Sequence, residues 1–385
     1  MRTMIVKYWL RGVSVAAALG LLSACSNGPS LPAPTKLVKI AETQVVTEHW
    51  QVRLGGGAEQ HALPLQPVLL AGAVYGASAS GVVSAIDAAS GKSLWQVDLQ
   101  RPISAGLGYL QDNLLVATAN GELHMLQASD GAVVWSTPTS SEVLAVPQSA
   151  SGMVLVQAID GRITAYAEAD AAVLWSYASD LPSLTLRGTS TPVVDGGVSY
   201  AGFANGKLLA VDNKQGKVVW QQRISAPQGR SDMERLVDID GPLQLVDGTL
   251  YVAGYQGNLA AVEAISGRVV WQQAVSSYTA PSIYGDQVYV VTDKDTVMAY
   301  DHQTGTELWR NDDFLHRGLS RVVASTDAVM VLDSLGYVHL LHPHTGMAIG
   351  RYKLGHDGAG AGFVRHGADI YVLGQDASLS RLSLN

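Results

Sequence analysis

Three histidines, His339, His342 and His344, come closest to a chemical site in this chain by type and spacing. Imidazoles at short spacing are typical of zinc ligands, but a zinc site needs further imidazole, thiolate or carboxylate ligands. No acid or thiol stands at a matching spacing, so the pattern favours a solvated cluster at a turn. Asp293 and Asp295 flank Lys294 in a predicted hairpin and are expected to serve its turn. Neither a Gly-x-Ser-x-Gly nucleophile motif nor a phosphate-binding loop occurs. The sequence therefore predicts no catalytic residue, no metal site and no cofactor.

The most regular feature of the chain is a tryptophan that recurs every 38 to 51 residues from Trp50 to Trp309. Most copies end the phrase Gly-x-x-x-Trp, and one copy has alanine in place of the glycine. The copies are GKSLW (91–95), GAVVW (131–135), AAVLW (171–175), GKVVW (216–220), GRVVW (267–271) and GTELW (305–309). This interval is the length of one four-stranded propeller blade. A tryptophan that returns in every blade predicts a contact with the neighbouring blade, because a single ligand could not use so many.

The two ends of the chain indicate how the blades are closed into a ring. The seventh copy of the repeat has Gly350 where the tryptophan is expected, and the eighth copy, 375–384, stops after its third strand. The segment 48–53 is an isolated strand that carries Trp50. Pairing this segment with the last blade would remove the exposed edges of an open sheet. The sequence therefore predicts an all-β, eight-bladed β-propeller over residues 41–385, with an open superhelix of the same units as the structural alternative.

The N-terminus has the pattern of an exported protein. Residues 1–24 combine basic residues with an apolar run that is too short for a stable membrane span, which predicts a secretory signal peptide. The sequence Leu22-Ser23-Ala24-Cys25 resembles the bacterial lipobox, whose cysteine is acylated; ordinary cleavage after Ala24 is the alternative. Because Cys25 is the only cysteine, no intramolecular disulfide is possible. Residues 25–40 are predicted to form a flexible tether.

The charge balance limits the possible partners. The chain has 25 basic and 33 acidic residues and a net charge of −8. This balance argues against nucleic acid and against anionic lipid headgroups as partners. The acyl chains on Cys25 are then the only predicted attachment to a membrane.

Function in a repeat protein is expected where the copies differ. Two connections between blades are long: one contains 180–188, and the other runs from 223 to 240. Both lead into the inner strands of adjacent blades. Their ends are therefore expected to lie side by side on one rim of the ring.

These two loops carry the candidate binding residues. Leu184 and Leu186 are spaced by two and would project the same way, beside Arg187, with Asp238 and Asp240 across the groove. Apolar anchors with an arginine and surrounding acids are typical of a protein interface. The alternative is that Arg187 pairs with Asp238 or Asp240 and merely fixes the two loops.

The chain resembles the BamB family, lipoproteins of the bacterial outer-membrane protein assembly (BAM) complex. The resemblance covers nearly the whole chain and is most specific in SLTLRG (183–188) and RLVDID (235–240). In that family the matching loops bind a periplasmic POTRA domain of BamA. By resemblance to lipoproteins, Ser26 favours sorting to the outer membrane. The resemblance implies a non-catalytic scaffold, lipidated at Cys25, that binds BamA through the five loop residues and meets the other BAM lipoproteins indirectly.

Two other functions remain open from the sequence. The tryptophan repeat also resembles quinoprotein dehydrogenases, which hold pyrroloquinoline quinone and calcium at the centre of an eight-bladed propeller. This chain cannot form the vicinal cysteine pair that many of them carry, and it has little sequence between blades for a calcium cage. A binder of cell-wall glycan or of unfolded outer-membrane proteins is the second alternative, since strand addition to a blade edge demands no particular sequence.

Overall fold

The computed structural model describes residues 32–57, 63, 65–355 and 362–384. The predicted signal peptide, Cys25 and the first part of the predicted tether lie outside these residues. The chain forms a compact unit from Thr35 onward. Across the described residues this unit consists of strands and turns, and nothing in them forms a helix suited to crossing a membrane.

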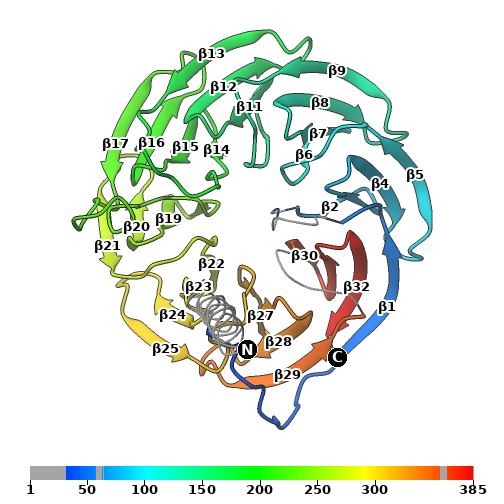
Figure 1. Ribbon diagram of the computed structural model, residues 1–385, viewed down its shortest axis with the longest axis vertical. Helices are drawn as coiled ribbons and strands as arrows, with labels where there is room; N and C mark the ends of the chain where they lie inside the picture. Colours follow the sequence, from blue (N-terminus) through cyan, green and yellow to red (C-terminus); the bar gives the residue numbers. More distant parts are fainter. Residues whose placement is uncertain (1–31, 58–62, 64, 356–361, 385) are drawn as a thin grey trace, which may run out of the picture. The chain divides into compact units, whose positions relative to one another are not determined.

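Eight four-stranded antiparallel sheets follow one another around a ring, as Figure 1 shows. In seven of them the strands are consecutive in the chain and run from the innermost to the outermost position. The eighth sheet combines the last three strands with the first strand of the chain. The prediction of an all-β, eight-bladed propeller is therefore confirmed, and the ring is closed.

The strands of blades 1 to 4 are β2 (Val68–Leu70), β3 (Ala73–Ala77), β4 (Val82–Asp87), β5 (Ser93–Asp98), β6 (Gly108–Leu110), β7 (Asn113–Ala117), β8 (Glu122–Gln127), β9 (Val133–Pro138), β10 (Gln148–Ala150), β11 (Met153–Gln157), β12 (Arg162–Ala167), β13 (Val173–Ala178), β14 (Val193–Asp195), β15 (Val198–Gly202), β16 (Lys207–Asp212) and β17 (Val218–Arg223). Those of blades 5 to 8 are β18 (Gln244–Val246), β19 (Thr249–Ala253), β20 (Leu259–Glu263), β21 (Val269–Gln273), β22 (Ser282–Tyr284), β23 (Gln287–Val291), β24 (Val297–Asp301), β25 (Glu307–Asn311), β26 (Val323–Ala324), β27 (Val329–Leu332), β28 (Tyr337–Leu341), β29 (Ala348–Lys353), β30 (Gly362–His366), β31 (Asp369–Leu373), β32 (Ser378–Leu384) and β1 (Val46–Arg53).

The burial pattern along each blade explains its sequence. The second and third strands are packed on both faces, so they read as continuous apolar runs; β16 is buried at all four of its central positions. The outermost strands have one face toward solvent, and in β17 exposed and partly buried residues alternate along its second half. Small and branched apolar residues thus form the core between neighbouring blades, while the outer wall of the ring contains both exposed and partly buried residues.

The N-terminal strand closes the ring as the sequence predicts. Strand β1 pairs antiparallel with β32, with Val46 opposite Leu384 and Arg53 opposite Ser378. Val46 is buried in the core cluster that contains Phe363. Blade 8 is therefore completed by a segment that lies at the other end of the chain.

The repeated tryptophans connect each blade to the next one. In seven blades the indole Nε1 donates a hydrogen bond of 2.7 to 3.1 Å to a backbone carbonyl of the following blade. The glycine of the next repeat lies directly against the indole: a Cβ on Gly216 would come within 2.6 Å of Trp175. Ala171 keeps the same left-handed backbone with a φ of 58°, which costs a residue with a Cβ some strain. The interpretation of these tryptophans as structural contacts is confirmed.

Gly350 breaks the repeat because the N-terminal segment crosses that position. The backbone N–H groups of Thr43 and Gln44 donate to the carbonyl of Ile349 at 2.8 and 3.1 Å. A Cβ on Gly350 would lie 2.5 Å from the carbonyl oxygen of Gln44. A tryptophan at this place would occupy the path of residues 43–44, which lie across the outer strand of blade 7.

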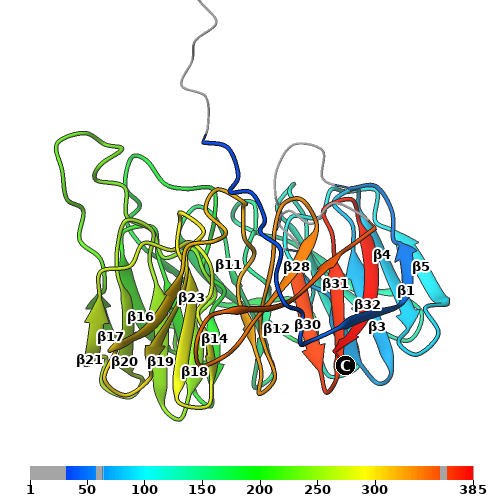
Figure 2. The same ribbon diagram turned by 90° about the horizontal axis from the view of Figure 1, so that it is seen from below.

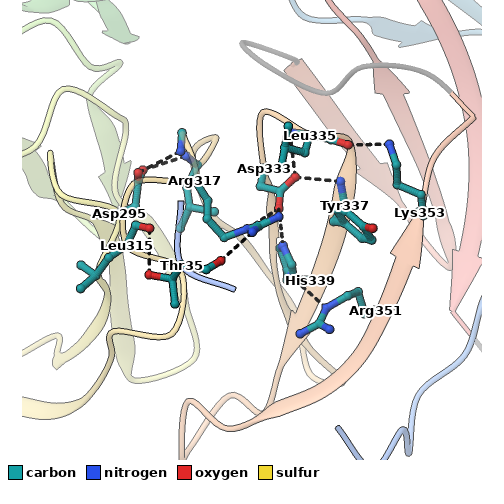
Figure 3. A network of polar contacts seen from close by, with 12 residues as sticks. Thr35, Asp295, Leu315, Arg317, Asp333, Leu335, Tyr337, His339, Arg351 and Lys353 are labelled. Carbon is teal, nitrogen blue, oxygen red and sulfur yellow. Dashed lines mark hydrogen bonds and ion pairs between the residues drawn. The ribbon is translucent and has the colours of Figure 1, made fainter. Parts of the chain in front are cut away.

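A buried charged cluster in blade 7, drawn in Figure 3, contains Arg317, Asp333, His339 and Arg351. The Nε atoms of Arg317 and His339 both bond Asp333 Oδ2, at 2.7 and 2.9 Å. The side chains of Arg317, Asp333 and His339 are only 4%, 0% and 1% exposed. Arg351 donates from Nε to His339 Nδ1 at 3.3 Å, and because arginine has no acceptor, His339 is the neutral tautomer with its proton on Nε2.

The predicted solvated histidine cluster is therefore wrong for His339. Its ring is buried against Phe314, with the two ring centroids 4.5 Å apart. His342 and His344 are exposed, as expected for a turn. Among the described residues no group of three potential ligands could hold a metal ion. The sequence could not reveal the burial of His339, because Phe314 and Arg317, which complete its surroundings, come from the connection that precedes blade 7.

The same cluster holds the N-terminal segment on the ring. Arg317 Nη1 donates to the carbonyl of Thr35 at 2.8 Å, and Arg351 Nη1 donates to that of Val38 at 3.0 Å. Leu37 packs against the core cluster that includes Phe314. Residues 35–40, which the sequence assigns to the tether, thus lie against blades 6 and 7.

Asp293 and Asp295 do more than serve their own turn. Asp295 is 5% exposed, and its carboxylate accepts hydrogen bonds from the backbone N–H groups of Gly318 and Leu319 at 2.9 and 2.8 Å. Asp293 accepts a hydrogen bond from Ser276 at 2.8 Å. The two carboxylates therefore tie blade 6 to its two neighbours.

Candidate docking site

The two long connections rise from the same rim of the ring. The first, 179–192, joins β13 to β14, and the second, 224–243, joins β17 to β18. In Figure 2 both project beyond the strands on one side of the ring. The N–H of Leu186 donates to Asp238 Oδ2 at 3.2 Å. The expectation that the ends of these loops lie side by side is therefore confirmed.

The first loop presents its apolar residues and its arginine to solvent to different degrees. Leu184 is 38% exposed, Leu186 is partly buried, and Arg187 is exposed. Arg187 does not pair with Asp238 or Asp240: its Nη2 donates to Glu142 Oε1 at 2.6 Å. The alternative in which Arg187 fixes the two loops through these aspartates is therefore wrong. Glu142 lies on the connection between blades 2 and 3 and orients the guanidinium from the opposite side.

Asp238 and Asp240 of the second loop contact the first loop from its buried side. Asp238 is 1% exposed, and an antiparallel bridge to Tyr255 anchors its backbone. Burial, and then the neighbouring Asp240 carboxyl, raise the pKa of Asp238 far above its ordinary value. Burial also raises the pKa of Asp240. Two carboxyl groups this close cannot both ionise easily, so they are expected to share a proton near neutral pH.

Asp240 also faces the axis of the ring. A Cβ on Gly188 would lie 2.7 Å from the Asp240 carboxyl carbon, so any larger residue there would displace the Asp240 side chain. Together with Leu186 and Arg187, these residues line one side of an axial cavity of about 480 Å³. The five residues predicted from the sequence are thus brought together: Leu184 and Arg187 are exposed on the rim, while Leu186, Asp238 and Asp240 lie deeper.

Asp238→Asn is expected to raise the free energy of unfolding at pH 8 by about 1–3 kcal/mol. Asparagine is neutral at every pH, and its amide oxygen can still accept the Leu186 N–H. Since folding raises the pKa of Asp238, its stabilising protonated form is complete below the unfolded value of about 3.9 and is lost as the pH rises through the folded value. The gain should therefore be small at pH 4 and grow toward pH 8. Denaturant midpoints measured at both pH values test this, and a loss of stability at pH 8 would contradict it.

Sequence reasoning missed Glu142 and Met233. Met233 is 68% exposed at the tip of the second loop, and its carbonyl accepts a hydrogen bond from Gln256 at 3.3 Å. A large apolar side chain in a polar loop is a signal that the sequence did contain. Glu142 carried no such signal, because its pairing with Arg187 depends on the distance between two connections, the one from blade 2 to blade 3 and the one from blade 3 to blade 4.

Solved structures with a similar fold include two groups of natural proteins. The crystal structure of BamB from Moraxella catarrhalis matches with a TM-score of 0.81 and 28% identity, covering 88% of this chain and 100% of that one. A quinohemoprotein alcohol dehydrogenase from Comamonas testosteroni matches with a TM-score of 0.70 but 13% identity, covering 88% and 76% of the two chains. At that identity the second likeness shows the fold alone.

Sequence relatives point to the first of these groups. The family described as "Outer membrane protein assembly factor BamB" matches residues 79–311 and 246–374. A relative of that name from Pseudomonas aeruginosa is 47% identical over 371 residues, which is 96% of this chain and 98% of the relative. The likeness thus includes both the blades and the two rim loops, and the chain belongs to the BamB family of outer membrane protein assembly factors.

Proposed function

We propose that this protein is a non-catalytic scaffold that binds the periplasmic POTRA region of BamA through its two rim loops and assists the assembly of β-barrel proteins into the outer membrane. The observation that carries the proposal is the exposure of Leu184 and Arg187 on a loop whose backbone is fixed from below by Asp238. Membership of the BamB family supports a role in outer-membrane protein assembly, and the two rim loops supply the surface that we propose to bind BamA.

The geometry of the loop favours binding in two ways. An apolar anchor beside an arginine is the composition of an interface hot spot. The Asp238 bond to the Leu186 N–H and the Glu142 bond to Arg187 hold these groups in place before a partner arrives, which reduces the conformational entropy lost on binding. Asp238 then acts by positioning the loop, whereas Leu184, Leu186 and Arg187 touch the partner.

The attachment to the membrane belongs to the same proposal. Cys25 would carry acyl chains that hold the protein at the periplasmic face of the outer membrane, and several such chains make an anchor effectively permanent. The anchor keeps the scaffold close to its partner, so that even a modest affinity for BamA yields a stable complex.

Leu186→Asp and Arg187→Ala are each expected to weaken binding to the purified POTRA region at least tenfold, because each removes a central contact. Leu184→Asp should have a similar effect and is more exposed, so it tests the surface even if Leu186→Asp perturbs the loop. The dissociation constants can be measured by biolayer interferometry, with thermal unfolding as the check that each propeller is intact.

Matched controls lie on the outer wall of blade 6. Leu308 is 47% exposed, and Arg310 is an exposed arginine paired with Glu307. Leu308→Asp and Arg310→Ala change the same residue types far from the rim loops, so they should bind like the unchanged protein. Unchanged affinity in the rim variants, or an equal loss in the outer-wall variants, would refute the proposed docking surface.

A further inference from the structure

Two arginines on the axis of the ring have side-chain donors without acceptors. The Nε atoms of Arg321 and Arg365 are both buried and have no hydrogen-bond partner within the described part of the chain. Arg321 donates one hydrogen bond, from Nη2 to the carbonyl of Phe363 at 2.9 Å. Arg365 reaches one carboxylate oxygen, that of the exposed Asp327, at 3.5 Å. Buried donors are almost always satisfied in native proteins, so these two groups, which line one hollow, are suited to an acceptor from outside the chain.

Both arginines line the same hollow. Its volume is about 470 Å³, and its wall also contains Tyr284 and Thr326, whose hydroxyl groups are hydrogen-bonded to each other at 2.5 Å. These residues come from the innermost strands of blades 6, 7 and 8, or from the segments next to them. A hydroxyl pair and two guanidinium groups make a wall of hydrogen-bond donors, and that wall holds more positive than negative charge.

The position of this hollow separates it from the rim loops. Tyr284, Thr326 and Arg365 lie at or after the ends of innermost strands, whereas the residues of the axial cavity beside Asp240 lie before or at their starts. Adjacent innermost strands run in the same direction along the axis, so the two openings are at opposite ends. Arg321 lines both spaces and therefore stands in the passage between them.

The electrostatic environment of Arg321 favours an anion as its partner. Burial lowers the pKa of its guanidinium. Arg317, by comparison, is paired with the carboxylate of Asp333. Arg321 donates to the carbonyl of Phe363, which accepts a hydrogen bond but carries no negative charge. The positive charge of the guanidinium is therefore not balanced by that contact.

We propose that Arg321 and Arg365 form a phosphate-binding site at the end of the ring opposite the rim loops. Two guanidinium groups match the charge of a phosphate dianion and offer it paired N–H donors. The hydroxyl groups of Tyr284 and Thr326 complete the site from blades 6 and 7. The occupant is free phosphate or the terminal phosphate of a monoester, and both present the same oxygens to these donors.

The test uses the whole mature protein at fixed ionic strength, with chloride as the reference anion. Inorganic phosphate and glycerol 3-phosphate are titrated separately, and binding is followed by isothermal calorimetry and thermal unfolding. A hundredfold excess over the dissociation constant should raise the melting temperature by about 3–5 °C. Arg321→Gln and Arg365→Gln should each weaken phosphate binding at least tenfold, and Arg310→Gln on the outer wall should leave it unchanged.

The stability of the variants without phosphate distinguishes a binding site from a structural link between blades 7 and 8. If the arginines serve a ligand, Arg365→Gln keeps or raises the melting temperature in chloride and loses the rise in phosphate. Equal binding of both probes assigns the site to a terminal phosphate, and binding of inorganic phosphate alone assigns it to the free ion. The proposal is overturned if neither probe binds saturably, or if both variants bind phosphate as well as the unchanged protein.

Discussion

Asp333→Asn is expected to lower the free energy of unfolding by about 3–5 kcal/mol, because it leaves Arg317 charged and almost fully buried without a compensating carboxylate. Arg317 and His339 both bond the same oxygen of Asp333, and neither can reach water instead. The midpoint of denaturant unfolding, followed by tryptophan fluorescence, measures the loss. Glu307→Gln is the control, since its bidentate pair with Arg310 is exposed and should contribute less than about 1 kcal/mol.

The pH dependence of the same cluster gives an independent check. Burial lowers the pKa of His339 and outweighs the bond to Asp333, which acts in the opposite direction. Burial would raise the pKa of Asp333, but the bonds from His339, Tyr337 and Arg317 together lower it. Both shifts make the folded state bind fewer protons than the unfolded state, so the contribution of this cluster to stability should fall as the pH drops below about 6.5, opposite in sign to the contribution of Asp238. The difference in unfolding midpoint between the unchanged protein and Asp333→Asn isolates this contribution, and a difference that is absent, or that stays constant between pH 7 and pH 4, would contradict the assigned role of the cluster.

Removal of β1 is the second change with a large expected effect. A chain that begins at residue 54 loses the fourth strand of blade 8 and the hydrogen bond from Trp50 to the carbonyl of Ala88. Trp50 is partly buried against the core, and loss of a core tryptophan costs about 3–5 kcal/mol. Together with the other residues of β1, this loss is comparable to much of the total stability of about 5–15 kcal/mol of a typical domain. The truncated chain should therefore fail to fold as a stable monomer.

Light scattering after size exclusion and limited proteolysis test this outcome. A chain that begins at Thr35 retains every contact of the ring described above and is the matched control. A peptide of residues 43–53 added to the truncated chain should restore protease resistance, because it supplies the missing strand and Trp50 in trans. A monodisperse, protease-resistant product without the peptide would show that the ring does not depend on its closing strand.

The fold was predictable from the sequence because each blade repeats its own packing contacts. The spacing between Gly216 and Trp220 is a local pattern, and the contact of each tryptophan with the next glycine follows from the same pattern one blade later. The pairing of β1 with β32 could be inferred from a missing strand and an unpaired one. The reason for Gly350 could not be inferred, because the path of Gln44 across blade 7 belongs to no repeat.

The candidate site was predictable only in part. The unusual lengths of the two connections identified them as candidate binding loops. That the two loops lie side by side follows from their positions before adjacent blades. The partner of Arg187 and the depth of Asp238 depend on distances between loops from different blades, which no sequence spacing records. The arginines of the axial passage were missed for the same reason, since Arg321 and Arg365 meet only after the ring is closed.

The segment from Thr35 to Arg53 gives the ring an order in which it would yield under force. A pull applied at residue 35 first loads the bonds of Thr35 to Arg317 and Leu315, then those of Val38 and Gln44 along blade 7. The closing strand β1 is reached only after these contacts have given way. Tension arriving from the N-terminal side is thus taken up in series by blades 6 and 7, so that the seam between β1 and β32 is the last part of the ring to bear the load.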